Sequence, residues 1–310
     1  LVSGGCLEGD IAEHARRVIE RREPSPLTYD LRDDGDDPFG LGIGCNGLIR
    51  VFLQPLFADG GYEPFASMAA VSLAPGGGAA ATVVAAGRSG LAPGATLVRA
   101  RRHGDGADAF RPAASAELRE RLGPGCERAL ETGRSEFRVD DDSGLAVLYA
   151  PLKPVPRLLV LGAGLDAVPV VDLAAEIGWL VTVADHRPAY LERGGFARAA
   201  RKREVVPGRL REALPLDEFD AVLVMSHHLA TDRAYLLELA GLVCRYVGVL
   251  GPPARKERLL ASLGDASSAL RERLRGPVGL DIGADSPEAI ALSILAELQG
   301  VLSGARPSLP

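Results

Sequence analysis

The sequence predicts an α/β protein of two domains, with a Rossmann-like, doubly wound parallel sheet in the C-terminal half. Three observations lead to this fold class. Strand-like apolar runs alternate with helical segments after residue 156, a glycine-rich turn follows the first of these runs, and a cluster of prolines precedes it. With 310 residues, 47% of them hydrophobic and 25% charged, the chain can bury two ordinary cores.

Three prolines within residues 151–156 mark the expected domain boundary, because they forbid a helix and favour an extended connection. We therefore expect an N-terminal domain over residues 1–152 and a C-terminal domain over residues 157–303. The chain begins with Leu1 rather than Met, so we expect that residues preceding it are missing and that the N-terminal domain is truncated.

The N-terminal domain is expected to be α/β or α+β, with a weak internal duplication. In each copy a helical segment is followed by a strand, an acidic turn and a second strand. The helix and the two strands are expected at 13–23, 27–31 and 47–56 in the first copy, and at 117–131, 135–139 and 144–152 in the second. The first copy carries an insertion, residues 38–46, which indicates either a functional loop or a plain surface loop.

The C-terminal domain alternates strands and helices, which is typical of a mostly parallel sheet. Strands are expected at 157–161, 180–184, 204–206, 221–225 and 246–250, and helices after Gly164, Thr231 and Pro253. A last helix is expected from Pro287 to about residue 301, because Ser286 can cap its first turn and Pro287 suits its first position.

A Gly-x-Gly-x-x-Ala pattern joins the first of these strands to its helix, the context in which the pattern indicates dinucleotide binding. Gly162 permits the tight turn, and Gly164 lets a pyrophosphate approach the helix N-terminus. Asp185 ends the next strand, where an acidic residue binds ribose hydroxyls. These residues predict a nicotinamide nucleotide, NAD(P), as one possible cofactor.

Two charged residues weaken that prediction. Asp166 places a carboxylate in the turn where a diphosphate would lie, and Arg187 either favours a phosphorylated ribose or pairs on the surface. The alternative is a Rossmann-like frame that binds a different nucleotide-like ligand, or none.

Further candidates lie where later strands end, beside the crevice in which open α/β sheets bind ligands. His227 can act there as an acid, a base or a ligand, whereas the adjacent His228 should point to the opposite side. Arg255 and Lys256 open the helix after the fifth strand, where they either meet an anionic ligand or form a solvated basic turn.

Two of the four cysteines, Cys6 and Cys45, lie among glycines, which uncover a thiol and let backbone amides approach it. We interpret these segments as a soft-ligand site. Its candidate residues are Gly4, Gly5, Cys6, Gly44 and Cys45. Cys126 and Cys244 have apolar neighbours and are expected to be buried. The wide spacing of the cysteines argues against a disulfide scaffold or a zinc ribbon and fits a reducing cytoplasm.

The net charge of −6 and the lack of a long basic run argue against nucleic acid or an anionic membrane as a partner. No apolar stretch is long enough to span a bilayer.

In these motifs the chain resembles the XdhC/CoxI family of accessory factors for molybdenum hydroxylases such as xanthine dehydrogenase and carbon monoxide dehydrogenase. The matching stretches are 3–9, 42–56, 159–164, 185–188, 222–227, 246–251 and 279–298. The resemblance implies a protein that binds the molybdenum cofactor (molybdopterin), assists its sulfuration with a cysteine desulfurase, and inserts it into the large subunit of the hydroxylase. It would be a chaperone rather than an enzyme. Cys6 matches the cysteine of the family's Ser-Gly-Gly-Cys motif and is the expected contact to molybdenum, a soft-ligand role that suits a thiolate.

The chain departs from the family in having Gly251-Pro252-Pro253 where a Gly-Ser pair is usual, which removes amide donors from an expected anion site. The alternative function is an NAD(P)-dependent oxidoreductase with His227 as acid or base. A third reading is an interaction module with a vestigial Rossmann frame. A homodimer is compatible with each of these.

Overall fold

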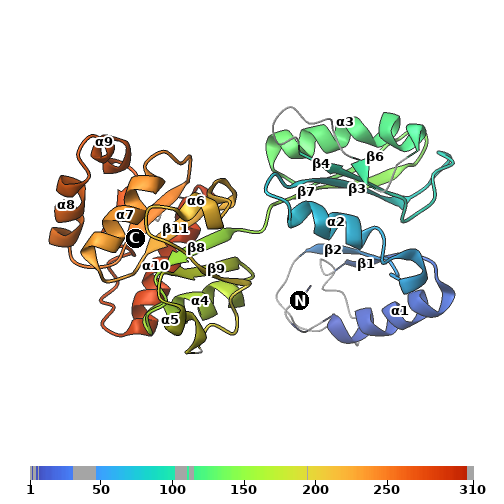
Figure 1. The fold of residues 1–310 in the computed structure, drawn as a ribbon. Helices are drawn as coiled ribbons and strands as arrows, with labels where there is room; N and C mark the ends of the chain where they lie inside the picture. The colour runs from blue at the N-terminus through green and yellow to red at the C-terminus, as the bar shows by residue number, and fades with distance from the viewer. Residues whose placement is uncertain are drawn as a thin grey trace. The chain divides into compact units, whose positions relative to one another are not determined.

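The computed structural model describes residues 2, 5, 7–30, 47–101, 110–111, 115–193 and 195–305, with the backbone alone at 110–111. The chain divides into two compact units, Leu1–Pro154 and Val155–Pro310 (Figure 1). Both units are mixed α/β, as predicted. Among the described residues, no helix is long and apolar enough to cross a membrane.

The N-terminal unit contains two antiparallel sheets. In the smaller one, β1 (Ser25–Asp30) pairs with β2 (Leu48–Leu53), and the hydroxyl of Tyr29 donates a 2.6 Å hydrogen bond to Asp10 of helix α1 (Glu8–Arg21). The larger sheet has the order β5-β4-β3-β7-β6. The other elements of this unit are η1 (Ala58–Gly60), α2 (Phe65–Ser72), β3 (Gly78–Ala85), β4 (Thr96–Ala100), β5 (Phe110–Arg111), α3 (Ala116–Thr132), β6 (Glu136–Val139) and β7 (Ala146–Leu152).

The pattern of a helix followed by two paired strands occurs twice, as α1-β1-β2 and α3-β6-β7. The two occurrences differ in their surroundings, since β1 and β2 form their own sheet whereas β6 and β7 join β3 and β4. The insertion at 38–46 lies outside the described residues.

The central strand β3 was not expected, because it is rich in alanine rather than in β-branched residues. Small side chains suit a strand that is covered on both faces. Ala79, Ala81 and Val83 belong to the core beneath α3, and Ala80 packs with Val71 of α2.

Replacing Gly125 with alanine is expected to destabilise the N-terminal unit by about 1–3 kcal/mol, because the added methyl group would overlap the ring of Tyr149. Gly123, also buried in α3, is the matched control, since a methyl group there meets no atom within 4 Å. Gly123→Ala should stabilise the helix by about 0.5–1 kcal/mol. Thermal unfolding followed by circular dichroism measures both changes. Equal effects of the two substitutions would contradict the packing argument.

The C-terminal unit contains a six-stranded sheet of order β10-β9-β8-β11-β12-β13, in which all pairs are parallel. This confirms the predicted doubly wound fold. Its elements are β8 (Arg157–Leu161), α4 (Ala167–Glu176), β9 (Leu180–Asp185), α5 (Pro188–Glu192), β10 (Arg201–Glu204), α6 (Leu210–Ala213), η2 (Leu216–Glu218), β11 (Ala221–Val224), α7 (Leu229–Leu239), β12 (Tyr246–Val249), α8 (Pro253–Ser262), α9 (Ala266–Arg271), β13 (Leu274–Arg275) and α10 (Pro287–Ser303).

Helices cover both faces of this sheet (Figure 1). The side chains of β8 alternate between two cores, with Leu158 and Val160 packing beside α4 and α10, and Leu159 and Leu161 packing beside α7 and α8. The strand predicted at 204–206 was misplaced, because β10 consists of the exposed charged residues 201–204. Val205, the apolar residue behind that prediction, is buried just after the strand ends.

Candidate functional site

The glycine turn after β8 brings two strand ends close together. Gly162 has φ +127°, and a Cβ atom there would lie 2.5 Å from the carbonyl carbon of Met225 and 2.7 Å from the nitrogen of Ser226, just after β11. A glycine is therefore required at this position both for its backbone conformation and for the close approach of two backbones.

Asp185 lies at the end of β9, as predicted, but its side chain is fully buried. Its carboxylate accepts a 2.7 Å hydrogen bond from the backbone nitrogen of Ala163 in the glycine turn, and three bonds of 2.9 Å from the backbone and guanidinium of Arg187. Burial alone would raise the pKa of Asp185, but the hydrogen bonds from Arg187 and Ala163 outweigh it and lower the pKa. In this structure Asp185 therefore holds the turn in place instead of presenting its oxygens to a ribose.

For Arg187 the sequence left two alternatives, binding of a phosphorylated ribose or an ion pair within the protein. The structure shows the ion pair. Its guanidinium is bonded to Asp185 and stacks on the ring of Tyr190, 3.7 Å from the ring centroid. These contacts occupy the guanidinium of Arg187, which could otherwise bind a ribose phosphate.

The sequence did not predict that Asp166 and His227 would form a pair. His227 Nε2 and Asp166 Oδ2 are 2.8 Å apart, and the other carboxylate oxygen lies 2.5 Å from the position that a Cβ of Gly164 would take. The space that the missing side chain of Gly164 leaves is thus occupied by the carboxylate of Asp166. A signal existed in the expected topology, because Asp166 follows β8 and His227 follows β11, its neighbour in the sheet.

The His227 backbone has φ +61°, in the left-handed region that few residues other than glycine adopt. Such conformations cost free energy and gather at functional sites. His228 instead caps helix α7, with its ring nitrogen accepting from the backbone of Thr231 at 3.4 Å. The two adjacent histidines therefore have different roles, since His227 pairs with Asp166 and His228 caps a helix.

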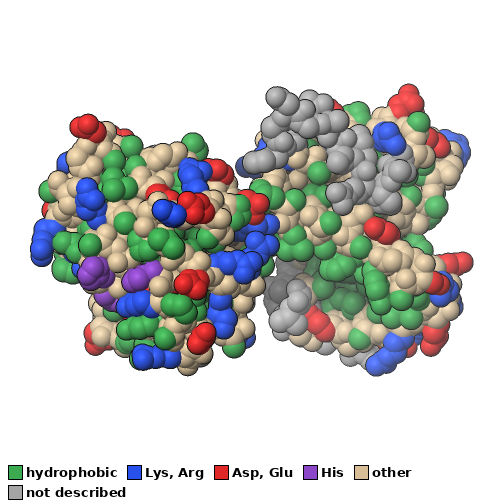
Figure 2. Space-filling model, viewed as in Figure 1, with side chains coloured by type: hydrophobic (Ala, Val, Ile, Leu, Met, Phe, Trp, Pro, Cys, Tyr) green, Lys and Arg blue, Asp and Glu red, His purple; other side chains and the backbone are tan. Residues whose placement is uncertain are grey.

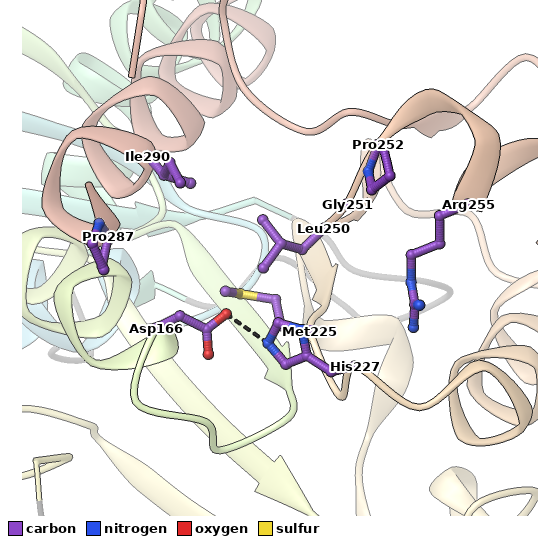
Figure 3. A pocket seen from close by; sticks show the side chains of 9 residues that line it. All are labelled: Asp166, Met225, His227, Leu250, Gly251, Pro252, Arg255, Pro287 and Ile290. Carbon is purple, nitrogen blue, oxygen red and sulfur yellow. Dashed lines mark hydrogen bonds and ion pairs between the residues drawn. The ribbon is translucent and has the colours of Figure 1, made fainter. Parts of the chain in front are cut away.

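The Asp166–His227 pair lines a cavity of about 430 Å³ at the carboxyl edge of the sheet (Figure 3). Its lining residues are Asp166, Met225, His227, Leu250, Gly251, Pro252, Arg255, Pro287 and Ile290. A second cavity of about 580 Å³ shares Leu250, Gly251, Pro252 and Ile290 with the first and continues along the loop that contains Asp281. These sizes are typical of small-molecule sites. Figure 2 shows histidine side chains at the surface of this unit, among basic and apolar side chains.

The two predicted basic residues are placed differently. Arg255 lines the first cavity, but its guanidinium lies 2.5 Å from Asp232, a buried carboxylate that also accepts from the hydroxyl of Ser226. Lys256 lines neither cavity, and its aliphatic stem lies beside Gly276. Its predicted role in binding an anion is not supported at these cavities.

Most of the predicted cysteine site, namely Gly4, Cys6, Gly44 and Cys45, lies outside the described residues. Gly5 is described, and its backbone nitrogen donates a 2.9 Å hydrogen bond to Glu8. Cys126 and Cys244 are buried, as expected, and burial raises the pKa of Cys126 to about 12. The described part of the chain contains no cluster of three or more metal-ligating side chains.

A parallel sheet of this order, with a ligand-sized cavity at the carboxyl ends of its central strands, defines the C-terminal unit as a Rossmann-type domain. Residues 158–298 match the family described as the XdhC Rossmann domain. This match covers most of the C-terminal unit, Val155–Pro310, and confirms the resemblance to this family that the sequence predicted.

Known proteins also resemble the chain beyond this domain. A protein of Bacillus subtilis, described as a probable xanthine dehydrogenase subunit, is 29% identical over 300 residues, which cover 96% of this chain and 82% of that protein. A solved structure described as a xanthine dehydrogenase from Bacillus halodurans aligns with all of this chain and 84% of its own, at 27% identity and a TM-score of 0.72. The uncharacterized protein YqeB from Escherichia coli is 28% identical over 57% of this chain and 33% of its own length.

Proposed function

We propose that this protein is an accessory factor for a molybdenum hydroxylase of the xanthine dehydrogenase or carbon monoxide dehydrogenase type. In this proposal it binds the molybdenum cofactor, assists its sulfuration together with a cysteine desulfurase, and inserts it into the large subunit of the hydroxylase. The observation that carries the proposal is the similarity over 96% of the chain to a probable xanthine dehydrogenase subunit, combined with the XdhC type of the Rossmann domain.

The described residues fit the pterin ring of this cofactor. The apolar walls formed by Met225, Leu250 and Ile290 can contact a planar pterin ring, and Asp166 and His227 offer polar atoms beside them. When bound, the cofactor supplies a molybdenum centre for hydroxylation in the client enzyme. The task of this chain is to hold the pterin, shield it from water and release it.

The alternative, an NAD(P)-dependent oxidoreductase, receives less support from the geometry. Asp185 is engaged by Ala163 and Arg187, and the Asp166 carboxylate lies where Gly164 would admit a pyrophosphate. A titration with NADH or NADPH, followed by nucleotide fluorescence, tests this alternative directly. Saturable binding of either nucleotide in the micromolar range would support the oxidoreductase alternative.

Cys6→Ala is expected to lower the molybdenum content of the purified protein at least tenfold, because a thiolate is a soft ligand suited to a sulfur-rich metal centre. The full chain is purified from molybdenum-replete cells. Metal is measured by mass spectrometry and the pterin as its fluorescent oxidation product. Cys126→Ala, which alters a buried thiol, is the matched control and should leave the metal content unchanged.

Two outcomes would count against this assignment, and they differ in meaning. Wild-type molybdenum content in the Cys6→Ala protein removes Cys6 from the site. If neither molybdenum nor pterin accompanies the wild-type protein, and the protein does not activate a cofactor-free hydroxylase supplied with the cofactor, the accessory role itself is wrong. Co-purification with a cysteine desulfurase tests the proposed part in sulfuration.

A further inference from the structure

We infer that Asp166 is the specificity-determining residue of the Rossmann cavity, and that its carboxylate receives a hydrogen-bond-donating heterocycle edge rather than a phosphate. The ligand class is a 2-amino-4-oxo pyrimidine-containing ring, such as a pterin. This inference deepens the proposed function and rests on it for the identity of the ligand, but it can be tested independently.

The Asp166 carboxylate occupies the place that a phosphate would need. A phosphate that entered the turn in the usual Rossmann manner would approach the backbone at Gly164. Asp166 Oδ1 already lies 2.5 Å from the Cβ position of that glycine. Phosphate binding would therefore require the side chain of Asp166 to move and its 2.8 Å contact with His227 to break.

The charge of the cavity also disfavours a phosphate. Among the described residues that line it, Arg255 is the single permanent cation, and it is paired at 2.5 Å with the buried carboxylate of Asp232. Asp166 adds a negative charge, and among the residues that the structure describes its carboxylate pairs only with the imidazole of His227. A diphosphate would bring like charge to this carboxylate without an unpaired cation to offset it, which is unfavourable.

The Asp166 carboxylate can accept further hydrogen bonds beside the one with His227. A carboxylate has about four lone-pair sites and accepts hydrogen bonds only, and His227 uses one site on Oδ2. Within the described part of the chain no group donates to Oδ1. The ring N–H and the adjacent amino group of a 2-amino-4-oxo pyrimidine are two neighbouring donors, which match two carboxylate oxygens.

The cavity around this carboxylate has apolar walls. Figure 3 shows Leu250 and Ile290 facing the same space as the Asp166–His227 pair. A flat, largely apolar ring can bury its faces against these side chains while its polar edge meets Asp166. The adjoining cavity of about 580 Å³ leaves room for substituents on the ring.

The test uses free pterin (2-amino-4-oxopteridine) and, as its matched analogue, lumazine, in which an oxygen replaces the amino group. Binding to the full-length protein is followed by pterin fluorescence or by calorimetry. Wild-type protein should bind pterin at least tenfold more tightly than lumazine, and Asp166→Asn should weaken pterin at least tenfold while changing lumazine little. Asp281→Asn, a carboxylate change in the adjoining cavity, is the control and should leave pterin binding unchanged.

Several results would overturn the inference. They are equal affinity of the wild-type protein for pterin and lumazine, an unchanged pterin affinity in Asp166→Asn, or tighter binding of ADP than of pterin. Measuring the molybdenum cofactor in the same variants separates this inference from the proposed function. Cofactor retained equally by wild-type and Asp166→Asn protein would refute the inference alone. Asp166-dependent pterin binding in a protein that never carries molybdenum and does not activate a cofactor-free hydroxylase supplied with the cofactor would refute the accessory role alone.

Discussion

Replacing Asp185 with alanine is expected to lower the free energy of unfolding of the C-terminal unit by about 3–5 kcal/mol, because it leaves a partly buried guanidinium and a backbone N–H without their acceptor. The carboxylate connects the end of β9 to the glycine turn by the hydrogen bond that it accepts from Ala163. Its removal is therefore expected to destabilise the turn beside the cavity as well. This is one of the two largest effects we expect from a single substitution in this unit.

Trp179 makes the measurement specific, because it is the one tryptophan of the chain and is only 6% exposed within the C-terminal core. Urea unfolding followed by its fluorescence therefore reports on this unit. The control is Asp217→Ala, since Asp217 also pairs with an arginine but is 76% exposed. We expect less than about 1 kcal/mol there. If both substitutions lowered the free energy of unfolding by a similar amount, the buried contacts of Asp185 would contribute no more to stability than an exposed ion pair.

The same carboxylate predicts a dependence of stability on pH. Because the folded protein lowers the pKa of Asp185, the ionised carboxylate stabilises the fold fully above its ordinary pKa of 3.8, and this contribution is lost as pH falls from there through the lower folded value. In Asp185→Asn this part of the acid sensitivity should disappear. Comparing the urea midpoints of the two proteins from pH 7 down to pH 3 provides the readout.

The C-terminal fold was predictable because its central strands are buried on both faces and therefore form continuous apolar runs in the sequence. The same physical rule explains which strands the sequence did not predict correctly. The edge strand β10 is a run of exposed charges, β13 has two residues, and β3 in the N-terminal unit is built of alanines between two helices. None of these gives the periodic signal of a half-buried strand.

At the candidate site, the sequence pattern predicted the edge of the sheet at which the cavity lies, but not the contacts that each side chain makes there. Gly164, His227 and Arg255 lie at or beside the cavity, as expected from their places after successive strands. The ribose role of Asp185 could not be evaluated from spacing alone, because it depends on whether Arg187 folds back onto the carboxylate, and in the structure it does. The Asp166–His227 pair depends on side-chain directions across two strands, which a sequence pattern does not encode.

Gly162→Ala is expected to destabilise the C-terminal unit by about 2–6 kcal/mol. A φ of +127° is strained for any residue with a Cβ, at a cost of about 1–3 kcal/mol. The new methyl group would also press on the backbone at Met225 and Ser226, and such overpacking adds about 1–3 kcal/mol because a strand end cannot move aside cheaply. Urea unfolding followed by Trp179 fluorescence measures the loss.

Gly251→Ala is a closely matched control, because Gly251 has φ +126° but the three atoms nearest its added methyl group all belong to the side chain of Arg255. The difference between the two variants therefore isolates the contact between backbones, and equal losses would refute it. This contact has a consequence for the site. Asp166 follows β8, which ends one residue before Gly162, and His227 follows β11, whose next residues lie against Gly162. A glycine that lets the two strand ends meet is thus what brings the carboxylate and the imidazole within hydrogen-bond distance.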